Sequence, residues 1–211
     1  MTVTKPEPSR SSWSRSLNCD GRYGITLATL LALLLTMAAM PAAWQELLSY
    51  TRTDLAAGQL WRLLTAHLVH VNPRHALANC AGLALLWALF ARGMRPLAWS
   101  FVVFACMMAI DAGLWLQQTQ LEWYRGASGV LHGVLVAGAV AHLRRERTLA
   151  LLSLALLCAK LAYEHSGGQL PTVGDLPVAS AAHIYGAFGG LTAIVPTLWR
   201  NKRGHGGGEP L

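Results

Sequence analysis

Long uncharged stretches separated by short basic clusters dominate this sequence and limit what it can fold into. Charged residues make up 13% of the chain, about half the roughly 25% typical of soluble domains. A helix that crosses a bilayer needs about 17–25 apolar residues, and most of the stretches approach that length. We identify six of them, the fifth being the shortest: residues 24–44, 73–91, 96–116, 126–143, 148–163 and 178–199. The sequence therefore predicts an all-α, polytopic membrane protein with a bundle of six transmembrane helices.

The basic residues fall mainly on one side of these stretches. Twelve of the seventeen lysines and arginines lie before the first stretch, between the second and third, between the fourth and fifth, or after the sixth. Short loops rich in lysine and arginine stay in the cytoplasm, so we expect both termini to be cytoplasmic. This asymmetry accounts for the net charge of +7. We therefore expect the lipid bilayer as the partner of this chain, and no nucleic acid.

We expect three parts: a mobile cytoplasmic N-terminal tail over residues 1–22, a membrane domain over 23–199, and a basic, Gly-rich cytoplasmic tail over 200–211. The first stretch resembles a signal peptide, but no clean cleavage site precedes Trp44, so an uncleaved helix is predicted. The four cysteines show no paired spacing and form no metal-binding knuckle. The sequence thus predicts structural thiols, no metal and no cofactor.

Polar residues inside apolar stretches are costly in a bilayer and therefore indicate a functional site. The second, fourth and sixth stretches would all run inward, so their first turns share the outer side of the membrane. This orientation places five polar side chains in the outer half of the bilayer: His75, Asn79, Ser128, His132 and His183. His67 and His70 come just before the second stretch, where we expect them to hold the outer loop in place.

Small residues indicate how two of these helices meet. Each of the fourth and sixth stretches carries a GxxxG pair, formed by Gly129 with Gly133 and by Gly186 with Gly190. Such pairs allow two helix backbones to approach closely. His183 shares a helical stripe with the second pair, so close packing would bring it within hydrogen-bond reach of Ser128. A serine needs such a base, because its hydroxyl is a weak nucleophile at neutral pH.

This pattern resembles the rhomboid family of intramembrane serine proteases over about residues 61–190. Four family motifs in the right order carry the resemblance: Trp61-Arg62, then His70 with His75 and Asn79, then Gly126-Ala127-Ser128-Gly129, then His183 with Gly186 and Gly190. The resemblance implies that Ser128 is the nucleophile and His183 the general base and acid. It also implies an oxyanion hole formed by His75, Asn79 and the backbone N–H of Ser128. Val130 replaces the last glycine of a G-x-S-x-G elbow, which argues against an α/β-hydrolase fold.

One position departs from the wider family and narrows the resemblance. Many rhomboids carry a tyrosine four residues after the serine, where this chain has His132. The stretch GASGVLHG and the short chain are more similar to the bacterial rhombosortase subfamily. That resemblance implies single-span membrane protein substrates, including C-terminal Gly-Gly sorting helices, cleaved near the periplasmic face of the inner membrane by hydrolysis or by transfer to an amine. His132 could brace His183, contact substrate or act as a base, and we favour bracing.

Asp111, near the outer end of the third stretch, is the only acidic residue that we place with these histidines. It could orient one of them in a triad, but the resemblance implies a Ser–His dyad, so we favour a structural or interfacial role. Trp61 and Arg62 are expected to anchor the outer loop, through an aromatic ring and a headgroup or carbonyl contact.

Two other functions remain open from the sequence. A catalytically silent relative that binds or escorts membrane helices would lack the serine or the histidine, and both are present. A metal transporter could use the imidazoles of five histidines, namely His67, His70, His75, His132 and His183. Transporters often contain inverted repeats, and the sequence shows none.

Overall fold

The structure is a computed structural model that describes residues 22–168 and 180–203. The predicted N-terminal tail up to residue 21 and the end of the predicted C-terminal tail, from residue 204, lie outside the described residues. Each predicted apolar stretch overlaps one long helix: α2 (Arg22–Ala38), α6 (Pro73–Phe90), α7 (Pro96–Gln117), α8 (Ser128–His142), α9 (Arg147–His165) and α10 (Ser180–Arg203). A short 3-10 turn, η1 (Ala91–Gly93), follows α6.

The start of α6 shows why a helix begins where it does. The side-chain oxygen of Asn72 accepts a hydrogen bond from the backbone N–H of His75 at 2.8 Å. Pro73 occupies the first turn, where its missing N–H costs nothing because that group has no intrahelical partner. Asparagine is a preferred N-cap residue and proline a preferred first helical residue, so the local sequence accounts for where α6 begins. His75 and Asn79 follow one turn apart on the same face of this helix.

The prediction of one continuous helix over residues 24–44 is wrong. Helix α2 ends at Ala38, and the chain turns by 116° into α3 (Ala42–Leu48). Pro41 explains the break, because proline has no N–H to donate and disfavours helical geometry in the residue before it. The chain therefore leaves α2 and enters the loop that precedes α6.

Length and composition identify fewer spans than we expected. Among the described residues, three helices are long and apolar enough to cross a membrane, namely α6 with η1, α7 and α9, or up to four if α2 and α3 form one bent span. Helix α8 is a shorter apolar helix. These helices support an integral membrane protein, and the six-span topology with cytoplasmic termini stays a prediction.

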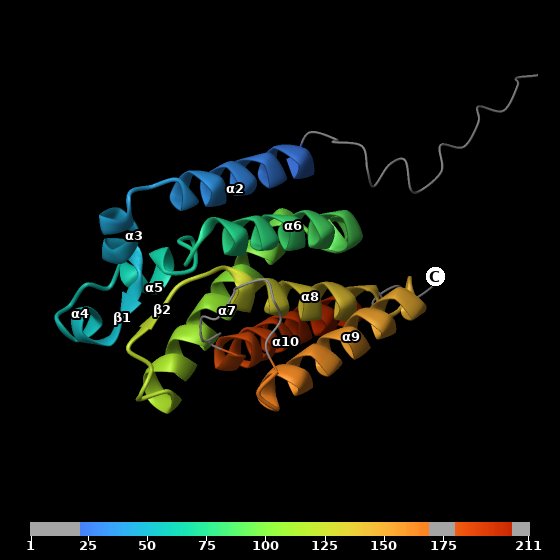
Figure 1. The fold of residues 1–211 in the computed structure, drawn as a ribbon. Helices are drawn as coiled ribbons and strands as arrows, with labels where there is room; N and C mark the ends of the chain where they lie inside the picture. Colours follow the sequence, from blue (N-terminus) through green and yellow to red (C-terminus); the bar gives the residue numbers. More distant parts are fainter. Residues whose placement is uncertain (1–21, 169–179, 204–211) are drawn as a thin grey trace, which may run out of the picture.

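Helix α10 packs most extensively against α8 and α7, so these three helices form the centre of the bundle (Figure 1). Helices α6 and α9 flank α8, and α2 packs on α6. The main core joins buried side chains of the three central helices, among them Ile110, Val130 and Ala182. Many large apolar side chains instead point outward, such as Leu97 at 82% and Phe188 at 62% exposed. Outward apolar faces on several helices suit a lipid environment.

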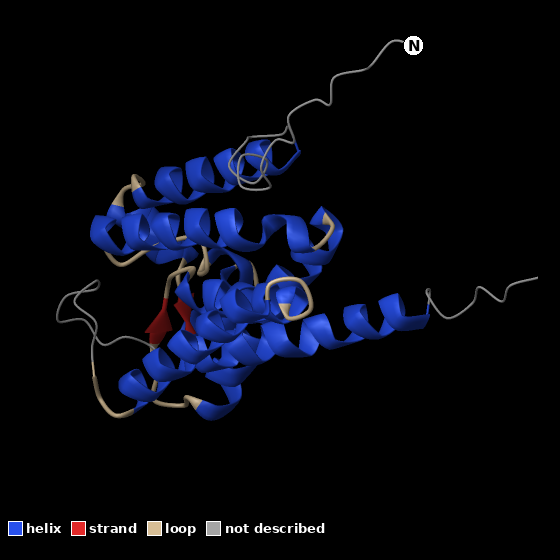
Figure 2. Cartoon of the chain, turned by 90° about the vertical axis from the view of Figure 1, so that its right-hand side faces the viewer, coloured by secondary structure: helices blue, strands red, loops and turns tan. Residues whose placement is uncertain are grey.

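The segment between α2 and α6, which keeps the name outer loop from its predicted side of the membrane, holds α3, β1 (Tyr50–Thr51), α4 (Arg52–Ala56) and α5 (Arg62–Thr65). Strand β1 pairs in antiparallel register with β2 (Trp123–Tyr124), placing Tyr50 opposite Tyr124 (Figure 2). Strand β2 lies just before α8. The pairing therefore fixes the outer loop to the segment that leads into the predicted serine motif.

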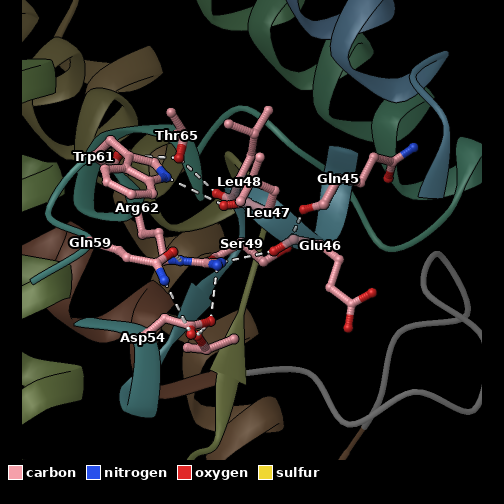
Figure 3. A network of polar contacts seen from close by, with 11 residues as sticks. Gln45, Glu46, Leu47, Leu48, Ser49, Asp54, Gln59, Trp61, Arg62 and Thr65 are labelled. Carbon is pink, nitrogen blue, oxygen red and sulfur yellow. Dashed lines mark hydrogen bonds and ion pairs between the residues drawn. The ribbon is translucent and has the colours of Figure 1, made fainter. Parts of the chain in front are cut away.

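Arg62 holds the outer loop together through backbone carbonyl groups (Figure 3). Its guanidinium donates to the carbonyl oxygens of Glu46 at 2.8 Å and Ser49 at 2.6 Å. It also pairs with the carboxylate of Asp54 at 2.9 Å. Arg62 is only 4% exposed, so its contacts are with protein carbonyls and a carboxylate, and a lipid headgroup contact is not needed. Trp61, half exposed beside it, donates its indole N–H to the carbonyl of Leu47 at 3.4 Å.

Candidate active site

A glycine turn places Ser128 at the first position of α8. Gly126 has φ of +132°, a backbone conformation that L side chains rarely adopt, and a Cβ there would lie 2.7 Å from the imidazole of His75. The turn is held by the bond from the N–H of Gly126 to the carbonyl of Ala66 at 2.8 Å. The hydroxyl of Tyr124 donates to the carbonyl of Gly126 at 2.7 Å. Burial raises the pKa of Tyr124, so its hydroxyl stays protonated as a donor.

The glycines of α8 and α10 bring the two helix backbones into direct contact. A Cβ on Gly186 would overlap the carbonyl of Gly129, and a Cβ on Gly190 would overlap the carbonyl of Gly133. Larger residues would hold the helices apart. At this crossing the hydroxyl oxygen of Ser128 lies 2.9 Å from Nε2 of His183. The structure thus brings together the two residues that the sequence proposed as nucleophile and base.

The other ring nitrogen of His183 contacts a residue that our sequence reasoning missed. Nδ1 of His183 lies 2.8 Å from Oε2 of Glu164, in the last turn of α9. The second carboxylate oxygen, Oε1, accepts from Nζ of Lys160 at 2.5 Å. The expectation that Asp111 is the only acid near the histidines is therefore wrong. The signal in the sequence was the i, i+4 spacing of Lys160 and Glu164 at the outer end of the fifth stretch.

These contacts assign the protons. A carboxylate only accepts hydrogen bonds, so Nδ1 of His183 carries the proton that faces Glu164. In the neutral imidazole Nε2 then keeps its lone pair, and that lone pair faces the hydroxyl of Ser128. This tautomer is the one that can remove a proton from the serine.

His132 lies beside this arrangement and contacts both Ser128 and His183. Its ring stacks on the ring of His183, with centroids 4.2 Å apart and planes inclined by 13°. Its Nδ1 lies 2.6 Å from the carbonyl oxygen of Ser128, which can only accept, so Nδ1 is the protonated nitrogen. His132 thus links the backbone of Ser128 to the ring of His183, a geometry that suits bracing.

A cavity of about 760 Å³ lies beside these residues. Its walls come from α6, α8 and α9, with leucines such as Leu85 and Leu156 lining much of it. Ser128 and His183 also line it, as do His75 and Asn79. Within the described part of the chain, Nδ1 of His75 and Nδ2 of Asn79 are buried without a hydrogen-bond partner. Both residues line the cavity, so these two atoms are the unpartnered polar groups nearest to a molecule bound there.

The remaining predicted residues lie behind the site. The carboxylate of Asp111 lies 3.3 Å from Nε2 of His67, and the ring of His67 packs edge-on to Tyr124. His70 packs edge-on to His75, with ring centroids 5.1 Å apart. Burial, with a smaller effect of the neighbouring His75, lowers the pKa of His70 to about 4, so it is neutral at pH 7. These groups support the loop and the first turn of α6.

The same site also offers a set of potential metal ligands. Ligand atoms of His132, Glu164 and His183 lie within 4.8 Å of one another. A metal ion needs lone pairs that converge on one point, whereas the two imidazoles are stacked nearly parallel. Nδ1 of His183 and both carboxylate oxygens already take part in hydrogen bonds. The geometry therefore favours proton transfer over metal coordination.

Comparison with known families agrees with this geometry. A family model described as Rhomboid domain matches residues 57–200, more than half of the chain. The match begins in the outer loop and includes Ser128, Glu164 and His183. Comparison with curated proteins and with solved structures found no match.

Proposed function

The chain belongs to the rhomboid family, whose members are generally intramembrane serine proteases acting on membrane proteins, and we propose that this protein is such a protease. Ser128 is its nucleophile and His183 its general base and acid. One observation carries the proposal. The Ser128 hydroxyl lies 2.9 Å from an imidazole nitrogen, at the wall of a largely apolar cavity that also contains two buried polar atoms without partners.

The reaction begins when the oxygen of Ser128 attacks the carbonyl carbon of the scissile peptide. Nε2 of His183 accepts the hydroxyl proton as the new C–O bond forms. The imidazolium then donates this proton to the leaving nitrogen, which breaks the C–N bond and leaves an acyl-enzyme. A water molecule, activated by the same imidazole, hydrolyses the ester and restores Ser128.

The negative charge on the tetrahedral intermediate falls next to three donors. Asn79 offers its side-chain amide and His75 its ring nitrogen, both of which line the cavity. The backbone N–H of Ser128 is at the first position of α8, where amides have no intrahelical partner and favour an anion. Donors fixed in place before the reaction stabilise the charge that develops in the transition state.

We propose that the substrates are single-span membrane proteins, cut near the outer face of the membrane. The site is formed by the first turns of α8 and α10 and the last turn of α9, so it lies at one end of the bundle. With cytoplasmic termini this end faces outward, which is the periplasm if the membrane is a bacterial inner membrane. The apolar walls of the cavity suit a membrane segment that has locally unwound.

We further propose rhombosortase-like selection of C-terminal Gly-Gly helices. Two features support it: the stretch GASGVLHG and the stacking of His132 on His183, at the place where many rhomboids carry tyrosine. A Gly-Gly sequence weakens a helix by roughly 1 kcal/mol per residue relative to alanine. Such a segment would expose its carbonyl groups to Ser128 more easily than a regular helix.

A fluorophosphonate probe tests the nucleophile directly. The purified protein in detergent is expected to be labelled, while Ser128→Ala and His183→Ala are not. Ser153→Ala is the matched control, because Ser153 lines the same cavity and its loss should leave labelling unchanged. Cleavage is then measured on two single-span reporters that differ only in a Gly-Gly or Leu-Leu pair in the membrane segment. A folded wild-type protein that is neither labelled nor active would contradict the proposal and favour the helix-binding alternative.

A further inference from the structure

We propose that Glu164 is a positioning residue for the reaction, so that the site works as a Ser–His–Glu arrangement in which Lys160 holds the carboxylate. The inference rests on the proposed serine-protease function and extends it. The sequence and the family resemblance implied a dyad without an acid. The observation behind the proposal is the continuous chain of contacts from Ser128 through His183 and Glu164 to Lys160.

The carboxylate is held in place from two sides. Oε2 of Glu164 accepts from Nδ1 of His183 at 2.8 Å, and Oε1 accepts from Lys160 at 2.5 Å. The side chains of Glu164 and His183 are each 6% exposed. A buried carboxylate without partners would be strongly unfavourable, so both contacts are needed to keep it ionised at this position.

The position of Glu164 on its helix points to a role beyond helix stability. Glu164 occupies the last turn of α9, where the negative end of the helix dipole disfavours an acidic side chain. Within α9 only the i, i+4 pair with Lys160 offsets this disadvantage. The contacts of Glu164 with His183 on α10 and with Lys160 compensate for this disadvantage.

Two consequences for the chemistry follow from this contact. First, Glu164 keeps the proton on Nδ1 of His183, which leaves the lone pair of Nε2 directed at Ser128. Second, when His183 accepts the serine proton, the imidazolium lies beside a negative charge that stabilises it. Glu164 exchanges no proton and forms no covalent bond, so it acts only through His183.

The main test compares Glu164→Gln with wild type and with Glu146→Gln in the reporter cleavage assay. Glu146 is the exposed N-cap residue at the opposite end of α9, so its substitution is a control for loss of an acidic charge next to the same helix. We expect Glu164→Gln to lower kcat by about 10²- to 10⁴-fold while KM changes by less than about threefold. Glu146→Gln should match wild type. A folded Glu164→Gln enzyme with wild-type kcat would overturn the inference.

Glu164→Asp separates positioning from simple charge balance. Aspartate keeps the charge but its side chain is one methylene shorter, so it reaches His183 less well. We expect a kcat between those of wild type and Glu164→Gln, that is, partial rescue. If the glutamine variant does not fold, Glu164→Asp alone tests the positioning role. A folded aspartate variant with wild-type kcat would show that only the charge matters, which would contradict that role. Lys160→Met should also lower kcat, by less than Glu164→Gln.

A spectroscopic test does not depend on activity. A proton shared between an imidazole Nδ1 and a carboxylate resonates far downfield in the ¹H NMR spectrum. We expect this resonance in wild type and in Ser128→Ala, and its loss in Glu164→Gln and His183→Ala. If neither wild type nor any variant cleaves a reporter, the proposed function fails. The resonance still tests the contact between His183 and Glu164. If wild type cleaves but the resonance is absent, the contact with Glu164 is what fails.

Discussion

The imidazole of His132 lies nearly parallel to that of His183, with 4.2 Å between the ring centroids. One residue of this pair is bonded to the backbone of Ser128 and the other to its side chain. The stack therefore restrains the plane of the ring that must accept the serine proton. It also explains why a planar ring is suited to this position, since a ring stacked on the imidazole of His183 fixes the orientation of that imidazole.

Replacing His132 by tyrosine should preserve this restraint. We expect His132→Tyr to keep kcat within about threefold of wild type, because a phenol ring can stack as an imidazole does. His132→Ala removes the stack, which is worth about 0.5–1.5 kcal/mol, and should lower kcat by roughly tenfold. Both values come from initial rates of reporter cleavage at saturating substrate. A folded but inactive His132→Tyr enzyme would instead indicate that His132 takes part directly in the chemistry.

The contact between α8 and α10 should tolerate no side chain at Gly186. A Cβ there would overlap the carbonyl group of Gly129, which is backbone and cannot move aside. We expect Gly186→Ala to destabilise the protein by roughly 1–3 kcal/mol and to abolish fluorophosphonate labelling, since the helices must separate.

Gly82→Ala on α6 is the control for the Gly186 variant. A Cβ at Gly82 would lie 3.4 Å from Leu131, an ordinary contact with a flexible side chain. Alanine is also the better helix former, so this variant should unfold at the wild-type temperature or above it. The thermal unfolding midpoint in detergent, followed by circular dichroism, checks both. A stable, fully labelled Gly186→Ala protein would contradict the close approach of the backbones.

The sequence predicted the parts of the site that follow from helical periodicity. Ser128 begins its helix, and His183 shares a stripe with two glycines, so their meeting could be expected from spacing and orientation alone. The start of α6 at Asn72 and Pro73 has a similarly local cause, an N-cap followed by proline. In each case the information lies within one or two turns of one helix.

Two of the missed features depend on packing between segments that are distant in the sequence. The third depends on a single proline within a long apolar stretch. Glu164 lies just beyond the end of the fifth predicted stretch, and its partner His183 is on another helix. The pairing of Tyr50 with Tyr124 joins two-residue strands, which are too short for a recognisable alternation. Pro41 was visible, but the apolar residues around it favoured one uninterrupted helix.

Asp111 provides a direct contrast with Glu164, because each is a buried acid beside a histidine. The carboxylate of Asp111 lies beside His67, behind the outer loop, and that of Glu164 beside His183. Asp111→Asn should therefore cost stability, about 1–3 kcal/mol for a disturbed buried polar group, while kcat stays within about threefold of wild type. Unfolding midpoints and reporter kinetics on the same preparations measure both. A large fall in kcat without loss of stability would show that Asp111 acts on the chemistry after all.

Asn79 should matter for the transition state more than for substrate binding. Its side-chain nitrogen is buried at the cavity wall and has no partner among the described residues, as expected of a donor that waits for a developing oxyanion. Removing one such donor from a serine protease lowers kcat by about 10²- to 10³-fold, and we expect a loss of this size for Asn79→Ala with little change in KM.

Asn72→Ser is the matched control for Asn79→Ala, since Asn72 belongs to the same helix and serine preserves its cap on His75. This variant should keep the kcat of wild type. Rates of fluorophosphonate labelling provide a second readout, because the probe also develops negative charge on an oxygen as it reacts. If Asn79→Ala raised KM and left kcat unchanged, Asn79 would be a substrate-binding residue, and the oxyanion would be held by His75 and the start of α8 alone.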